Sequence, residues 1–202
     1  GVLDLAYMRS VPNMTVSAPM NEEELRNLMY SAQKDNMGPF SIRYPRGRGV
    51  MPEWEKPFHK IPVGKGRMIR DGHDIAILSI GHVGNFVVEA PEKLKKENIS
   101  VCHYDMRFVK PLDNEILHRV FKEFQSVITI EDGTIIGGFG SAVIEFMADH
   151  QYSSHVTRIG VPDYFIEQGT PGELYHECGF DAEGIFITVK KLLKRKTISN
   201  TG

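Results

Sequence analysis

The chain has 202 residues, of which 41% are hydrophobic and 25% charged, the proportions of a soluble globular protein with one or two domains. Its 24 lysines and arginines nearly balance its 26 aspartates and glutamates, which excludes the strongly basic surface of a nucleic-acid-binding protein. No apolar run could span a bilayer, no signal peptide is evident, and Cys102 and Cys178 lack metal-ligand spacing, so we expect no membrane partner and a reduced cytoplasmic setting.

The first fifty residues predict a strand, a helix and a second strand. A short helix over 1–9 precedes a brief strand over 15–19, and Asn21 is expected to cap the main helix. Apolar side chains recur at helical spacing along that helix and predict one buried face: Leu25, Leu28, Met29 and Ala32. With the next strand, over 40–44, this order indicates part of a parallel α/β sheet.

The sequence RYPRG at 43–47 places two arginines at the end of a predicted strand. Pro45 fixes φ and has no N–H, so the strand should stop there and leave Arg46 on the loop at the carboxyl edge of the sheet. Gly47 permits a sharp turn. The planar guanidinium of an arginine at such an edge suits a phosphate or a carboxylate. The structural alternative is that Arg43 and Arg46 pair with acidic side chains at a domain or subunit interface.

Residues 50–63 predict a linker, because they hold three prolines and follow neither the helical nor the strand period. Trp54 within it is expected to lie against a surface. From 64 to 193 strands alternate with helices, which predicts a doubly wound domain with a mostly parallel sheet. The basic tail at 194–202 is expected to be disordered. The strands of the domain are predicted near 64–70, 74–80, 99–106, 127–130 and 156–161.

Local signals predict three boundaries inside this domain. Asp71-Gly72 has the composition of a hairpin turn between the first two strands. Pro91 interrupts the helix that follows the second strand. Asp113 is expected to cap the next helix.

Three short motifs have both a structural and a functional interpretation. The loop 81–85, which contains His82, lies between a strand and a helix, where backbone N–H groups can bind an anion, although helix capping is the commoner role. Glu131 and Asp132 have the chemistry of general acids, but no nucleophile is near in sequence, which favours a capping or interface role. The glycines of 137–140 do not match a phosphate-binding fingerprint and predict a tight turn.

Six motifs follow one another along the chain, and the ordered set is specific although each motif alone is weak. In this order they resemble the carboxyl-terminal portion of the 1-deoxy-D-xylulose-5-phosphate synthase family, thiamine-diphosphate enzymes of the transketolase type. The resemblance covers nearly the whole chain, from Gly1 to about Leu193. The motifs are DLAYMR at 4–9, PNM at 12–14, RYPRG at 43–47, DMRFVKPLD at 105–113, GGFGS at 137–141 and GVPD at 160–163.

The resemblance implies that 1–49 is the last part of a pyrimidine-binding domain and that 64–193 is a transketolase carboxyl-terminal domain. It implies a homodimeric enzyme that uses thiamine diphosphate and Mg²⁺ to condense pyruvate with glyceraldehyde 3-phosphate, with loss of CO₂, in the non-mevalonate isoprenoid route. In that family the second arginine of the tip binds the phosphate of the aldehyde, a role that carries over to Arg46. Arg43 is a second candidate for phosphate binding, with a structural role favoured.

The chain also departs from the family. The Gly-Asp-Gly motif for the diphosphate and Mg²⁺, with its later asparagine, is missing, so we expect no cofactor, metal or catalytic residue in this chain and no activity from it alone. Its start at Gly1, inside an apparent helix, likewise predicts a fragment. His82 stands where the family usually has a small hydroxyl residue.

Two alternative functions remain open. The chain could belong to the β-type subunit of a 2-oxo-acid dehydrogenase, which shares the fold and passes its acyl group to a lipoyl arm. A tip that recognises phosphate argues against this alternative. The other alternative is a non-catalytic assembly module that kept the fold and lost the site.

Overall fold

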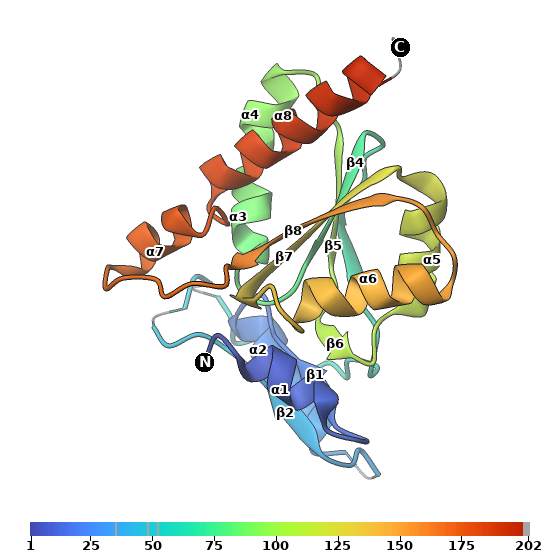
Figure 1. Ribbon diagram of the computed structural model, residues 1–202. Helices are drawn as coiled ribbons and strands as arrows, with labels where there is room; N and C mark the ends of the chain where they lie inside the picture. Colours follow the sequence, from blue (N-terminus) through green and yellow to red (C-terminus); the bar gives the residue numbers. More distant parts are fainter. Residues whose placement is uncertain (35, 48, 52, 200–202) are drawn as a thin grey trace.

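Figure 1 shows the chain as a computed structural model, which describes residues 1–34, 36–47, 49–51 and 53–199. The described residues form two sheets, one of three strands and one of five. We call residues 1–49 the first unit and residues 64–193 the second unit. In Figure 1 the helices and strands of the first unit, in blue, lie together at one end of the larger sheet.

The first unit contributes two strands to the smaller sheet. Its elements are α1 (Asp4–Ser10), β1 (Thr15–Ser17), α2 (Glu22–Ala32) and β2 (Phe40–Ile42). β1 and β2 are parallel, as their order predicted. The third strand, β6 (Phe108–Lys110), comes from the second unit and runs antiparallel to β1. The two units therefore share a sheet, and the sequence pattern did not predict β6.

The second unit is built on the larger sheet. In spatial order its strands are β3 (Arg67–Arg70), β5 (Val101–Asp105), β4 (Ile75–Ser79), β7 (Ser126–Thr134) and β8 (His155–Val161). The neighbouring pairs are parallel except β3 with β5, which confirms the predicted mostly parallel sheet. All five residues of β4 are buried, so its nearly continuous apolar sequence lies at the centre of the sheet.

Helices cover both faces of this sheet, because successive side chains of a strand point to opposite faces. Ala76 and Leu78 belong to a core with α5 (Asn114–Glu123) and α6 (Phe139–Asp149). Ile75 and Ile77 belong to a second core with α3 (Gly84–Glu89), α4 (Pro91–Lys96) and α8 (Ala182–Ser199). Figure 1 shows these two groups of helices on opposite sides of the sheet, with α7 (Pro171–Glu177) just before α8. The doubly wound architecture is thus confirmed.

Three predicted boundaries are confirmed. The side chain of Asn21 caps α2 by accepting a hydrogen bond of 3.0 Å from the N–H of Glu24. Asp113 caps α5 by accepting hydrogen bonds from two backbone N–H groups at 3.1 and 3.2 Å. Pro91 is the first residue of α4, so it separates α3 from α4 at a position where its missing N–H costs nothing.

Two predictions about the ends of elements are wrong. Asp71-Gly72 does not close a hairpin, because β3 pairs with β5 and not with β4. The strand with arginines at both ends, β3, takes the edge, while the apolar β4 is buried between β5 and β7. The basic tail is helical from 194 to 199, because α8 continues to Ser199. Lysine and arginine are good helix formers, which allows this continuation. Residues 200–202 lie outside the described residues.

The predicted buried face of α2 is correct only at Leu28, which is buried as expected. The buried residues of α2 are Glu24, Asn27, Leu28 and Ser31, whereas Met29 is 41% exposed. This face is polar because it binds the linker: the side chain of Asn27 accepts a hydrogen bond from the N–H of His59, and Ser31 accepts one from the N–H of Ile61. The linker therefore lies against α2, and the guanidinium of Arg26 lies 5.7 Å from the centre of the Trp54 ring.

A buried network of two carboxylates and two guanidinium groups joins α2 to the second unit. Glu24 is 4% exposed and accepts hydrogen bonds from Arg107 at 2.6 and 2.8 Å, and it pairs with Arg67 at 2.9 Å. Arg67 also pairs with Asp105 at 3.1 Å. Burial raises the pKa of Asp105 to about 6, against the opposing effect of Arg67. Each charge in this network thus depends on a partner from another element.

We predict that Glu24→Gln lowers the free energy of unfolding by about 3–5 kcal/mol, because it leaves two largely buried arginines without their shared carboxylate. The matched control on the same helix is Glu23→Gln. Glu23 pairs with the more exposed Lys56, and its loss should cost less than about 1 kcal/mol. Urea unfolding of both variants checks this prediction. Equal losses in the free energy of unfolding would show that the network does not stabilise the contact between the two units.

Candidate functional site

Strand β2 ends two residues earlier than the predicted 40–44, so the tip at 43–47 lies outside the smaller sheet. Strand β2 ends at Ile42, and the N–H of Arg43 donates the last hydrogen bond to β1, 2.8 Å from the carbonyl oxygen of Ser17. β1 itself ends at Ser17, so the tip has no further strand with which to pair. Gly47 has φ of +148°, which confirms that this position needs a glycine.

Arg46 lines a cavity of about 480 Å³ between the two units. The first unit contributes the tip and the start of α2, including Asn21. The second unit contributes His82 and Phe86, at and after the carboxyl end of β4, and Tyr175 of α7. Arg46 is exposed, and no ion pair joins it to a carboxylate within the described part of the chain. The cavity therefore offers an available guanidinium beside the amino terminus of the eleven-residue helix α2.

Arg43 has a different environment, because its guanidinium forms an ion pair with the buried carboxylate of Asp132. Its Nη2 also lies 3.5 Å from the carbonyl oxygen of Asp132. Burial by itself raises the pKa of Asp132, but the neighbouring His82 and Arg43 lower it to about 2. Asp132 is thus ionised at neutral pH and holds Arg43 at the base of the tip. This geometry favours a structural role for Arg43.

His82 shares Asp132 with Arg43. Its Nδ1 lies 3.1 Å from Oδ2 of Asp132, the oxygen that also contacts Arg43. The alignment is not that of a hydrogen bond, and neither ring nitrogen of His82 has a hydrogen-bond partner among the described residues. The side chain of His82 does not cap α3, which begins at Gly84 without a side-chain cap.

Glu131 and Asp132 lie inside β7, not after it, and point to different partners. The carboxylate of Glu131 accepts hydrogen bonds of 2.8 Å from the N–H groups of Phe139 and Gly140, the first two residues of α6. Burial raises the pKa of Glu131 to about 7, against the effect of these donors. Glu131 therefore caps a helix and Asp132 lies at an interface, the two roles that the sequence favoured.

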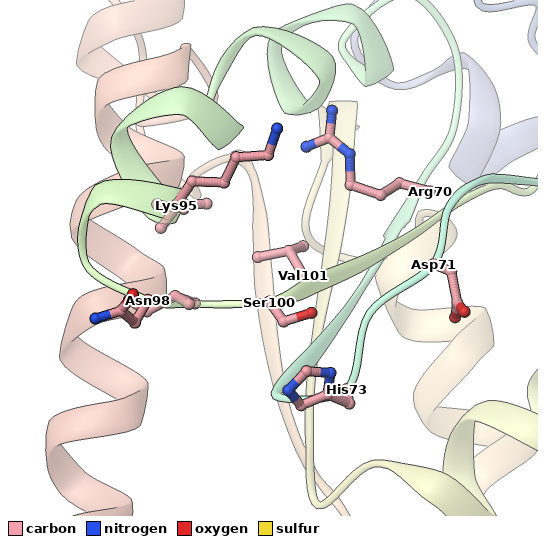
Figure 2. A pocket seen from close by; sticks show the side chains of 9 residues that line it. Arg70, Asp71, His73, Lys95, Asn98, Ser100 and Val101 are labelled. Atoms are coloured by element: carbon pink, nitrogen blue, oxygen red, sulfur yellow. The ribbon is translucent and has the colours of Figure 1, made fainter.

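A second cavity, of about 310 Å³, lies at the opposite edge of the larger sheet. It is lined by Arg70, His73, Lys95 and Ser100, among others. Figure 2 shows the ends of Lys95 and Arg70 pointing toward each other, and the carboxylate of Asp71 pointing away from them. This cavity is next to the amino ends of β4 and β5. Open parallel sheets bind ligands at their carboxyl ends, so the Arg46 cavity is the better candidate site.

The described residues do not fit the thiamine diphosphate and Mg²⁺ that the family resemblance implies. They contain no group of three or more His, Cys, Asp or Glu side chains that could hold a metal ion. The acidic side chains nearest the cavity are already engaged: Asp132 holds Arg43, and Glu22 accepts hydrogen bonds from Val50 and Met51.

No helix in the described ranges is long and apolar enough to cross a membrane.

Sequence reasoning proposed Arg46 as a ligand-binding residue and favoured helix capping for the loop of His82, and it missed how the cavity is closed. Tyr175 comes after the last predicted strand, and nothing in its sequence links it to a tip some 130 positions earlier. The sequence favoured a capping or interface role for Asp132 but did not identify Arg43 as its partner. The pairing of Arg43 with Asp132 can be recognised only once the relative placement of β2 and β7 is known, which a single sequence does not give.

Comparisons with known proteins agree on one group. Residues 64–185 match the family described as transketolase, C-terminal domain. The 1-deoxy-D-xylulose-5-phosphate synthase of Cytophaga hutchinsonii is 60% identical over 193 residues, which are 95% of this chain and 30% of the relative. The enzyme of the same name from Bacteroides fragilis is 55% identical over 192 residues, with 95% and 30% covered. The chain thus spans about 30% of the length of these relatives.

A solved structure shows the same fold. It is described as "Split gene transketolase, inactive beta4 tetramer" and is 33% identical to this chain, with a TM-score of 0.85. The match covers 96% of this chain and 62% of the solved one. Both units of the chain therefore have counterparts in that structure.

We predict that Asp132→Asn destabilises the protein in a pH-dependent way. The pKa of Asp132 is lowered on folding from 3.8 to about 2, so its ionised form stabilises the folded state above about pH 4. That contribution, about 2 kcal/mol, is lost as the pH falls from about 4 toward 2. Urea unfolding across this range should show the difference between the wild type and the variant shrinking. The exposed Asp149→Asn is the control, and a difference independent of pH contradicts the prediction.

Proposed function

Since this chain belongs to the transketolase family, whose carboxyl-terminal domain it contains, we propose that it forms the carboxyl-terminal part of a 1-deoxy-D-xylulose-5-phosphate synthase. That enzyme would condense pyruvate with glyceraldehyde 3-phosphate, with loss of CO₂, and supply the non-mevalonate route to isoprenoids. The names of the curated relatives support this reaction over that of a 2-oxo-acid dehydrogenase.

One observation carries the proposal: Arg46 lines a cavity between the two units with an available guanidinium. Arg43, the other arginine of the tip, is held by Asp132, so the two have separate roles. Arg46 would bind the phosphate of the aldehyde, which is remote from the reacting carbonyl carbon. Binding energy from such a non-reacting group holds the aldehyde in place for the reaction. Asn21, at the amino terminus of α2, lines the same cavity and makes it more favourable for an anion.

The rest of the catalytic machinery would come from the remainder of the enzyme. The family consists of thiamine-diphosphate-dependent transferases, and the cofactor supplies the chemistry that forms and cleaves carbon–carbon bonds. Because the described residues do not fit the cofactor and Mg²⁺, we assign no step of that chemistry to this chain. The working enzyme would be a cytoplasmic homodimer.

Exposed apolar side chains on the first unit support assembly with further protein. Val2, Leu3, Tyr7, Met8 and Val11 lie on or beside α1 and are between 37% and 65% exposed. So much apolar surface on one short segment is typical of a face that is covered in the complete protein. This surface would contribute to the contact with the remaining part of the synthase or with the second subunit.

We predict that Arg46→Ala in the full-length enzyme raises KM for glyceraldehyde 3-phosphate by about tenfold to hundredfold, because a hydrogen bond to a charged group contributes roughly 1.5–3 kcal/mol. KM for pyruvate should change little. Arg46→Lys should recover part of the loss, since it keeps the charge but not the planar fork. The control is Arg70→Ala, because Arg70 lines the other cavity. An equal rise for both substrates would exclude the phosphate role.

A second candidate is a non-catalytic subunit or assembly module. This candidate is favoured by the description of the similar solved structure as an inactive tetramer from a split gene. That description applies to the solved protein itself. We predict that the 202-residue chain alone gives no deoxyxylulose phosphate from pyruvate, glyceraldehyde 3-phosphate, thiamine diphosphate and Mg²⁺, whereas the full-length enzyme does. Product from the chain alone would contradict the proposed division of roles, and no product from folded full-length protein would favour the assembly module.

A further inference from the structure

His82 lies between the Arg46 cavity and the Arg43–Asp132 ion pair. It follows the carboxyl end of β4, and its ring packs beside two aromatic rings that also contact each other, 6.3 Å from the centre of Phe86 and 5.5 Å from the centre of Tyr175. His82, Phe86 and Tyr175 all line the cavity. The imidazole therefore lies in the wall of the candidate anion site, and its Nδ1 is 3.1 Å from Oδ2 of Asp132, which does not line the cavity.

The carboxylate of Asp132 lies close enough to His82 to select the tautomer of its neutral ring. A neutral imidazole beside an ionised carboxylate carries its proton on Nδ1, because a lone pair there would face the Oδ2 of Asp132 at 3.1 Å. In that state His82, Asp132 and Arg43 together have no net charge. A second proton gives the group a net charge of +1 in a largely buried place. An anion in the neighbouring cavity would stabilise this added charge.

We propose that His82 couples proton uptake to anion binding in the Arg46 cavity, so that a doubly charged phosphate monoester binds more tightly when His82 is protonated. By linkage, binding of the anion also favours protonation of His82. His82 is a positioning residue in this scheme, because it acts on the ligand through charge and through Asp132. The inference rests on the proposed function, since that function makes the anion a substrate phosphate.

The other charged or titratable groups around His82 do not account for such coupling. Asp132 is ionised well below neutral pH, and the two arginines of the tip stay charged. Burial raises the pKa of Tyr175, so its hydroxyl is neutral near pH 7. Glu22 is bound to the N–H groups of Val50 and Met51. Among the described residues lining the cavity, only an imidazole belongs to a side-chain type that ordinarily changes charge between about pH 5 and pH 8.

Inorganic sulfate tests the coupling in the full-length enzyme, because it stays doubly charged near neutral pH and so adds no titration of its own. We expect its dissociation constant in the wild type to rise roughly threefold to tenfold from pH 6 to pH 8, the effect of one nearby charge on a dianion. In His82→Gln this rise should disappear. An unchanged rise in His82→Gln, or no rise in the wild type, overturns the inference.

Two further measurements separate the possible failures. Arg46→Ala should abolish the binding of sulfate at this site, and unchanged sulfate binding would contradict the proposed function together with the coupling. Loss of sulfate binding in Arg46→Ala with an unchanged pH dependence in His82→Gln would contradict the coupling alone. Should His82→Gln fail to fold, calorimetry of the wild type in two buffers of different ionisation enthalpy decides: proton uptake on sulfate binding supports the coupling, and its absence overturns it.

Discussion

The structure depends on carboxylates buried at the contact between its two units, where each requires an arginine from another segment. Glu24 of α2 is held by Arg107 and Arg67, and Asp132 of β7 is held together with Arg43 of the tip. A buried ion pair adds little net stability over apolar packing, but a buried charge without its partner is costly. Only arrangements that satisfy these pairs are therefore stable, and this requirement fixes the first unit against the second.

This constraint gives the two arginines of the tip different roles. Arg43 and Arg46 are three positions apart, yet Asp132 engages only Arg43. The base of the tip is thereby attached to the larger sheet, while Arg46 remains at the edge of a cavity that neither unit forms alone. A ligand in that cavity would contact both units, so the geometry of the site depends on the buried pairs at the joint.

The same constraint separates the two adjacent carboxylates of β7. Side chains of successive strand residues point to opposite faces, so Glu131 reaches the start of α6 and Asp132 reaches the tip. Burial dominates for Glu131, whose pKa rises to about 7, whereas for Asp132 the contacts with His82 and Arg43 together outweigh burial and lower the pKa to about 2. Two acids next to each other in the sequence thus stabilise different parts of the fold, and Asp132 links His82 to the tip.

The amino-acid sequence by itself determined the features that depend on neighbours along the chain. The apolar run of β4, the caps Asn21 and Asp113, the break at Pro91 and the turn at Gly47 all follow from local chemistry. Local chemistry also placed Arg46 on the loop after a strand, whereas its phosphate-binding role was inferred from the family resemblance. Only the tertiary structure decided which strands pair and which face of α2 is buried. β3 lies beside β5, and Glu24, Asn27 and Ser31 are buried, because their polar partners are distant in sequence. The contributions of Asp132, His82 and Tyr175 to the site likewise depend on contacts across the joint, and such contacts leave no periodic pattern in a single sequence.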